Sequence, residues 1–110
     1  MKLAIIGSRS IKEIDFEKHI KIQPVLVVSG GAVGVDTLAE NWAKANGIAT
    51  LIIKPDYARY GRVAPLIRNK DIVKESDFVI AFWDGKSKGT EHTINYAKKA
   101  GKRVEIILVQ

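Results

Sequence analysis

The chain has no cysteine and only two histidines among its 110 residues. Without cysteine it forms no disulfide and carries out no thiolate chemistry, which is compatible with a reducing compartment. No apolar run approaches the ~20 residues that a membrane-spanning helix needs. The N-terminal MKLAII also lacks the longer apolar stretch and cleavage site of a signal peptide. We therefore expect a cytoplasmic protein that has no membrane partner.

Familiar catalytic and cofactor motifs are missing as well. The sequence contains no H-E-x-x-H, no G-x-S-x-G and no P-loop, and residues 7–12 read GSRSIK instead of the dinucleotide fingerprint G-x-G-x-x-G. These absences count against a simple NAD-dependent dehydrogenase and a simple NTPase. They leave few catalytic constellations, and we predict no metal site and no certain cofactor.

Positive charge is what the composition does supply. Eighteen Lys and Arg residues against twelve Asp and Glu give a net charge of +6. Such a balance favours anionic partners, namely nucleotides, nucleic acid or an acidic surface, although it can also serve solubility alone.

Five short apolar runs, rich in Val and Ile, alternate with segments of helical periodicity. The runs predict strands that are buried on both faces, at 2–6, 25–29, 49–53, 78–83 and 103–108. This alternation is typical of an α/β protein with a three-layer, Rossmann-like fold. Right-handed crossovers then favour a five-stranded, mostly parallel sheet of order 3-2-1-4-5, with helices on both faces. We expect one domain over residues 1–110.

The helices between these strands differ in the strength of their signals. A weak pattern predicts a first helix around 14–22. The second has its inner face at Val35, Leu38, Ala39, Trp42 and Ala43 and ends at Gly47. The third begins near Pro65, with Leu66, Ile67 and Val73 facing inward, and the fourth has Thr90 as N-cap and ends at Gly101.

Three of the strand patterns end in glycine-bearing turns, within 3–10, 25–36 and 78–90. Turns of this kind expose backbone N–H groups at strand ends and helix N-termini, where phosphates bind. In the predicted sheet the crevice lies between strands 1 and 4, where the strand order reverses. The alternative is that Gly7, Gly30 and Gly31 only make tight turns.

Charged and aromatic side chains are predicted near the same edge. Arg9 and Arg68 are the preferred anion ligands because guanidinium binds phosphate through two hydrogen bonds. Asp84 is a candidate to accept from a ribose hydroxyl or to hold a metal-bound water, whereas Asp36 is expected to complement amides of its own helix. The alternatives for the other residues are balanced: Tyr57, Tyr60 and Trp83 stack on a base or pack, and His92 touches ligand or does not.

The combined pattern resembles a known family. The stretches that carry the likeness are IIGSR at 5–9, VVSGGAVGVDTLAENWAKANGI at 27–48, YGRVAPLIRNKDIV at 60–73 and DFVIAFWDGKSKGTEHTINYAKKAGK at 77–102. They are similar to the YspA/YpsA-related branch of the SLOG superfamily. That Rossmann-like group also contains the DNA-processing protein DprA and the Lonely Guy hydrolases.

The resemblance implies a pocket for a nucleotide or nucleotide derivative. The ligand contacts that it implies are Gly7, Ser8 and Arg9; Ser29, Gly30 and Gly31; Arg68 and Asn69; and Gly89 and Thr90. It also implies sensing of nucleotide-derived signals, and pairing through helices into a homodimer.

The sequence departs from the hydrolase relatives at one position. Their motif G-G-x-G-T-x-x-E has Thr93 in place of its glutamate here, and Glu91 is two residues out of register, roughly 200° around a helix. We therefore expect a binding or sensing module. A nucleotide N-glycosidic or phosphate hydrolase and a nucleic-acid-binding protein remain the alternatives.

Overall fold

The computed structural model describes residues 1–109; Gln110, the last residue of the expected domain, lies outside them. The strands are β1 (Lys2–Gly7), β2 (Leu26–Ser29), β3 (Ala49–Ile52), β4 (Phe78–Trp83) and β5 (Arg103–Leu108). The helices are α1 (Phe16–His19), α2 (Val35–Ala45), α3 (Tyr57–Tyr60), the 3₁₀ turn η1 (Gly61–Val63), α4 (Ala64–Lys74) and α5 (Lys88–Lys99).

The five strands form one parallel sheet of order β3-β2-β1-β4-β5. The predicted α/β class and strand order are therefore confirmed. Strand β1 lies in the middle of the sheet, and Leu3 to Ile5 on it are completely buried. Because the chain moves first towards β3 and later towards β5, the order reverses beside β1, between β1 and β4.

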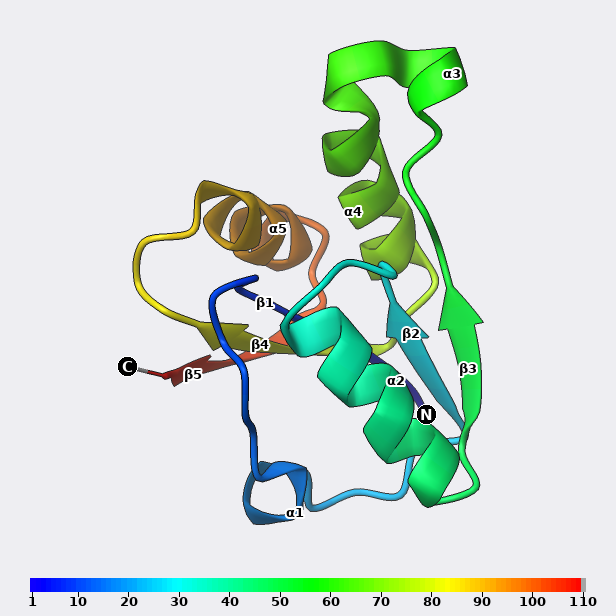
Figure 1. Cartoon of the computed structure of the whole chain (residues 1–110), viewed down its shortest axis with the longest axis vertical. Helices are drawn as coiled ribbons and strands as arrows, with labels where there is room; N and C mark the ends of the chain where they lie inside the picture. The colour runs from blue at the N-terminus through cyan, green and yellow to red at the C-terminus, as the bar shows by residue number, and fades with distance from the viewer. Residues whose placement is uncertain (110) are drawn as a thin grey trace.

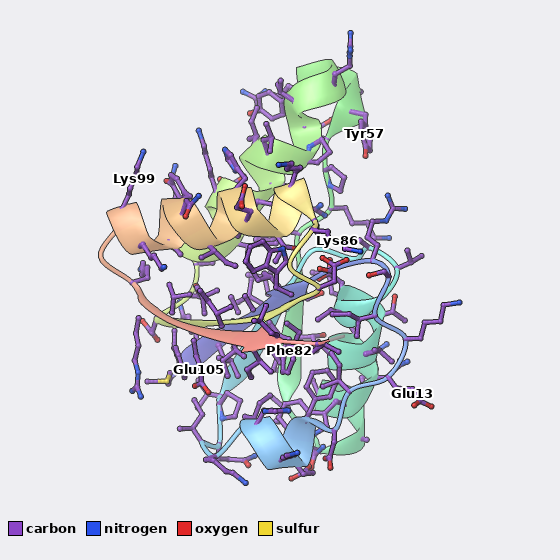
Figure 2. All side chains as sticks on the ribbon, turned by 90° about the vertical axis from the view of Figure 1, so that its left-hand side faces the viewer. Glu13, Tyr57, Phe82, Lys86, Lys99 and Glu105 are labelled. Atoms are coloured by element: carbon purple, nitrogen blue, oxygen red, sulfur yellow. The ribbon has the colours of Figure 1, made fainter. Side chains whose placement is uncertain are left out.

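Helices cover both faces of this sheet (Figure 1). On one face α1 and α2 pack over the sheet, with Phe16, Val35 and Ala39 in one apolar core. On the other face α4 and α5 pack side by side, with Ile72 and Ile94 in a second core. Figure 2 shows the same three layers from the side, with the labelled Phe82 in the interior between the helix layers.

One glycine in the first turn is fixed by this packing. An added Cβ on Gly7 would overlap the carbonyl oxygen of Phe82 and lie 2.6 Å from Cγ2 of Val35. Gly7 thus lets the start of α2 approach β1 and β4, which a larger residue would prevent. This glycine has a structural reason independent of any ligand.

The helical predictions were less accurate than the strands. The expected helix at 14–22 is the single turn α1, because Ile20 already has extended φ and ψ angles and is buried. Helix α3 and the turn η1 were not predicted. Thr90 is not the N-cap of α5; the hydroxyl of Ser87 accepts from its backbone N–H instead.

Two further expectations concern burial. Leu66 was predicted to face the core, but it is 37% exposed, whereas Ala64, Ile72 and Val73 form the buried face of α4. The edge strand β5 is not buried on both faces, since Ile106 and Leu108 are exposed. Among residues 1–109, none of the helices has the length and apolar character required to cross a bilayer.

Candidate functional site

A cleft of about 520 Å³ opens where the strand order reverses. Its lining comes from the ends of β1 and β2, the first turns of α2 and α5, the α3 region and α4. Eight of the residues predicted for the site line it together: Gly7, Arg9, Gly30, Gly31, Arg68, Asn69, Gly89 and Thr90. In Figure 2 the labelled Tyr57 and Lys86 mark this end of the molecule, opposite Lys99.

The first turn of α5 forms one wall. Ser87 caps the helix, its hydroxyl accepting from the N–H of Thr90 at 3.4 Å. Gly89 follows the cap at the second helical position, and a Cβ added there would meet nothing within 4 Å. Neither its backbone angle nor protein packing therefore requires glycine at 89. The positive end of the helix dipole, roughly half a charge, lies at this open position.

The end of β2 and helix α4 form the opposite wall. Arg68 donates from Nη1 to the carbonyl oxygen of Gly30 at 2.5 Å and from Nε to Oδ1 of Asn69 at 2.8 Å. A Cβ on Gly30 would lie 2.6 Å from Nη1 of Arg68, so a larger residue at this position would displace the guanidinium. The guanidinium is thus held in one orientation in the cleft while some of its five N–H donors stay available.

Asp36 also lines this wall, although it was expected only to complement its own helix. It does accept from the backbone N–H of Ala32 through Oδ2, at 3.2 Å, so part of that expectation is met. Burial nevertheless raises the pKa of Asp36 from 3.8 to about 6, against the lowering effects of Ala32 and Arg68. Nearby Glu40 raises the pKa further. Asp36 is thus a carboxylate in a cleft whose other charged lining residues are Arg9 and Arg68.

Three predicted site residues are not part of the lining; they hold the turns behind it. The hydroxyl of buried Ser8 accepts from the N–H of Asp84 at 3.1 Å. Buried Ser29 donates to Oε1 of Glu40 at 3.0 Å. Ser8 thus joins the ends of β1 and β4, and Ser29 joins the end of β2 to α2, so both support the cleft from behind its lining.

Asp84 is the third of these residues. Its Oδ1 accepts from the N–H groups of Lys86 and Ser87, both at 2.8 Å, and its Oδ2 accepts from the hydroxyl of Ser10 at 2.8 Å. The two backbone N–H groups, then that hydroxyl, hold the pKa of Asp84 well below its ordinary value. The carboxylate therefore organises the β4–α5 loop.

Sequence reasoning placed the turn that contains Ser87 at the cleft, but it did not predict Asp36 or Thr93 as lining residues. Thr93 donates from its hydroxyl to the carbonyl of Gly89 at 2.9 Å, whereas Glu91 is exposed and outside the lining. The helical spacing of Gly89, Thr90 and Thr93 was the available signal for Thr93.

His92 does not line this cleft. It lines a second groove on α4 and α5 together with Lys70, Asn95, Tyr96 and Lys99. Within residues 1–109, no three His, Asp or Glu side chains are grouped closely enough to hold a metal ion.

The five parallel strands and the cleft at their reversal point define a Rossmann-like protein with an anion-compatible site. The chain belongs to the YspA, cpYpsA-related SLOG family, whose model matches residues 1–60. The matched residues include β1, β2, α2 and the loops that follow the two strands, and these segments supply Gly7, Arg9, Gly30 and Asp36 to the cleft.

Two individual proteins are similar to this chain. The gene 61 protein of Mycobacterium phage D29 is 31% identical over 113 residues, which cover 91% of this chain and 90% of that protein. DNA processing protein A from Helicobacter pylori, whose structure was described for its single-stranded DNA binding mode, has a TM-score of 0.73 at 24% identity. The match covers 100% of this chain and 66% of that one, and it supports the fold.

Proposed function

We propose that the protein binds a nucleotide or a nucleotide-derived anion in the cleft between the end of β2 and the first turn of α5. The observation that carries this proposal is that Arg68 and Gly89 line the same cleft. A guanidinium with available donors and an open helix N-terminus thus border one space. Both groups attract phosphate, and the glycine lets a ligand oxygen approach the first amides of α5.

The size of the cleft agrees with a ligand of this kind. Its volume of about 520 Å³ lies within the roughly 300–1,000 Å³ of small-molecule sites. The lining also includes Tyr57 and Leu66, two exposed side chains that offer an apolar surface to a base. We therefore assign the phosphate to the Arg68–Gly89 side and the base to the α3 side.

The test is a thermal-shift panel with AMP, GMP, CMP, ADP-ribose and NAD. A ligand at 100 times its dissociation constant stabilises the fold by about 2.7 kcal/mol, which raises the melting temperature by several degrees. Gly89→Val should remove that shift, because its side chain enters the space that the phosphate needs. Lys98→Val is the control on the exposed side of the same helix. Equal ligand shifts for wild type and Gly89→Val would contradict the proposed position.

A second candidate function is single-stranded nucleic-acid binding, favoured by the α3 region together with the structural neighbour. Tyr57 and Tyr60 are 60% and 36% exposed. The guanidinium of Arg59 lies 5.2 Å from the ring centre of Tyr60. Exposed tyrosines interleaved with arginine are typical of surfaces on which successive bases stack.

Salt dependence separates the two functions. Binding along a nucleic-acid backbone weakens steeply between about 50 and 200 mM salt, because each neutralised phosphate releases counterions. We would measure a dT oligonucleotide against TMP at both salt concentrations, with wild type and Tyr60→Ala. A steep salt slope, stronger binding of the oligonucleotide and a loss in Tyr60→Ala would place nucleic acid first. Equal affinities for the oligonucleotide and TMP would reject this second function.

A further inference from the structure

We propose that Asp36 makes the cleft selective for a phosphorylated sugar, by accepting a hydrogen bond from a hydroxyl of the ligand while Arg68 and the start of α5 hold its phosphate. This inference rests on the proposed function and names the class of ligand. It assigns a specificity role to a residue that would otherwise oppose anion binding.

The cleft is lined by charges of both signs. Arg9, Arg68 and the open end of α5 all attract anions, whereas the Asp36 carboxylate in the same lining repels them. An anion that carries no hydrogen to donate, such as sulfate, gains nothing from this carboxylate. A ligand that presents a hydroxyl to it turns the repulsion into a hydrogen bond, since a carboxylate accepts and does not donate.

The Asp36 carboxylate has acceptor sites left for a ligand. Asp36 is 8% exposed, and burial opposes its ionisation. The groups around it are the amides of Ala32 and Gly30 on its own loop, Glu40 one turn along α2, and Arg68 from α4. A carboxylate has about four acceptor sites, so these two amides leave room for a ligand donor.

Arg68 and Asp36 lie close to each other on either side of Gly30. A Cβ on Gly30 would lie 2.6 Å from Nη1 of Arg68 and 2.8 Å from Oδ2 of Asp36. One glycine therefore separates the group that binds the phosphate from the group that accepts the hydroxyl. A ligand that engages both carries its anionic group and its hydroxyl on a compact unit, as a ribose phosphate does.

The experiment measures the dissociation constants of sulfate, ribose 5-phosphate, AMP and 2′,3′-dideoxy-AMP at pH 7.5 by calorimetry. For the wild type we expect AMP to bind at least about tenfold more tightly than its dideoxy analogue, since a buried acceptor left unpaired costs about 1–3 kcal/mol and tenfold is 1.4 kcal/mol. Asp36→Asn should lose most of this preference and bind sulfate, which has no hydrogen to donate, more tightly than the wild type does.

Glu91→Gln is the matched control. It makes the same charge change in the first turn of the other cleft helix, on an exposed side chain outside the lining. It should keep the preference for AMP. A second readout is pH, since the preference of the wild type should fade as Asp36 takes up a proton near pH 6, and that of Glu91→Gln should fade alike.

The outcomes separate this inference from the function beneath it. If AMP and its dideoxy analogue bind the wild type equally well, Asp36 does not recognise a ligand hydroxyl, whereas the proposed binding of an anion in the cleft is still supported. If Asp36→Asn keeps the full preference for hydroxyls, another residue accepts them and the inference is overturned. If none of the four compounds binds at millimolar concentration, the proposed function itself fails.

Discussion

Asp36 and Asp84 belong to the same edge of the sheet and have opposite surroundings. Asp84 accepts three hydrogen bonds of 2.8 Å, two of them from backbone amides of its own loop. Asp36 is buried against α4 and accepts from Ala32 at 3.2 Å. The pKa of Asp84 is accordingly lowered, and that of Asp36 is raised to about 6.

The two carboxylates differ in how many hydrogen-bond acceptor sites remain free for a ligand. In the β4–α5 loop the donors and the carboxylate satisfy one another, so the loop is stable by itself. In the β2–α2 wall a buried carboxylate remains under-satisfied beside a guanidinium, at a cost to stability. Perturbed groups of this kind concentrate at functional sites, which is why we place the ligand against Asp36 and Arg68.

The largest effect should come from Arg68→Ala, which removes the cation of the under-satisfied wall. We expect ligand affinity to fall at least about 100-fold, or about 2.7 kcal/mol, because the phosphate loses a charge-assisted partner. Loss of the Coulombic contribution of Arg68 should also raise the pKa of Asp36 beyond about 6. Calorimetry with the best ligand of the panel measures the first effect, and an NMR titration of the carboxyl group measures the second.

Lys74→Ala is the control for Arg68→Ala, since it removes one positive charge from the exposed end of the same helix. It should change affinity by less than about threefold, because exposed charges are screened by salt. A comparable loss in both variants would mean that net charge, and not the wall, attracts the ligand.

The next effect is on stability, because ionisation of the buried Asp36 lowers the free energy of unfolding. Its folded pKa of about 6 lies above the ordinary value of 3.8, so the free energy of unfolding declines as pH rises from about 4 to about 6. That difference corresponds to about 3 kcal/mol as an upper limit. Asp36→Asn should therefore be more stable than wild type at pH 7.5, with little difference near pH 3.5, in urea unfolding. A variant less stable than wild type at pH 7.5 would show that the buried Asp36 carboxylate does not destabilise the fold.

Asp84→Ala should act in the opposite direction. Because the folded pKa of Asp84 is lowered, its carboxylate stabilises the fold above its unfolded pKa of 3.8, and this contribution is lost as pH falls further. We expect a lower melting temperature at neutral pH and a narrowing gap to wild type below about pH 3.8. Melting scans across pH measure this difference. A variant as stable as wild type at pH 7 would show that the hydrogen bonds of Asp84 do not stabilise the β4–α5 loop.

The sequence predicts the fold well because its signals are local. Apolar runs of four to six residues, three of which lead into glycine-bearing turns, determine the strands, and the alternation with helices determines a parallel sheet. The helix at 14–22 was wrong because Ile20 leaves helical geometry in order to be buried, which is a tertiary effect. The short helix α3 has little more than its Asp56 cap as a signal.

The site is predictable only in part, for a related reason. Glycines and arginines at strand ends identify its location, but the contact of Arg68 with Gly30 joins residues 38 positions apart. Whether Asp84 or Asp36 lines the cleft depends on where the local turn directs each carboxylate: Asp84 accepts from the amides of Lys86 and Ser87, and Asp36 lies in the lining beside Arg68. That choice follows from the turn geometry, and the residue types alone do not reveal it.

The smallest effect should come from Gly89→Ala, which separates stability from binding in the α5 wall. A Cβ at this helical position meets nothing within 4 Å, and the φ of Gly89 is not positive. Alanine should therefore stabilise the fold by about 0.5–1 kcal/mol, since glycine is costly in a helix. The same methyl group projects into the cleft and should weaken ligand binding severalfold. Chemical denaturation and calorimetry on one preparation measure both, and a variant that gains stability and keeps full affinity would move the ligand away from α5.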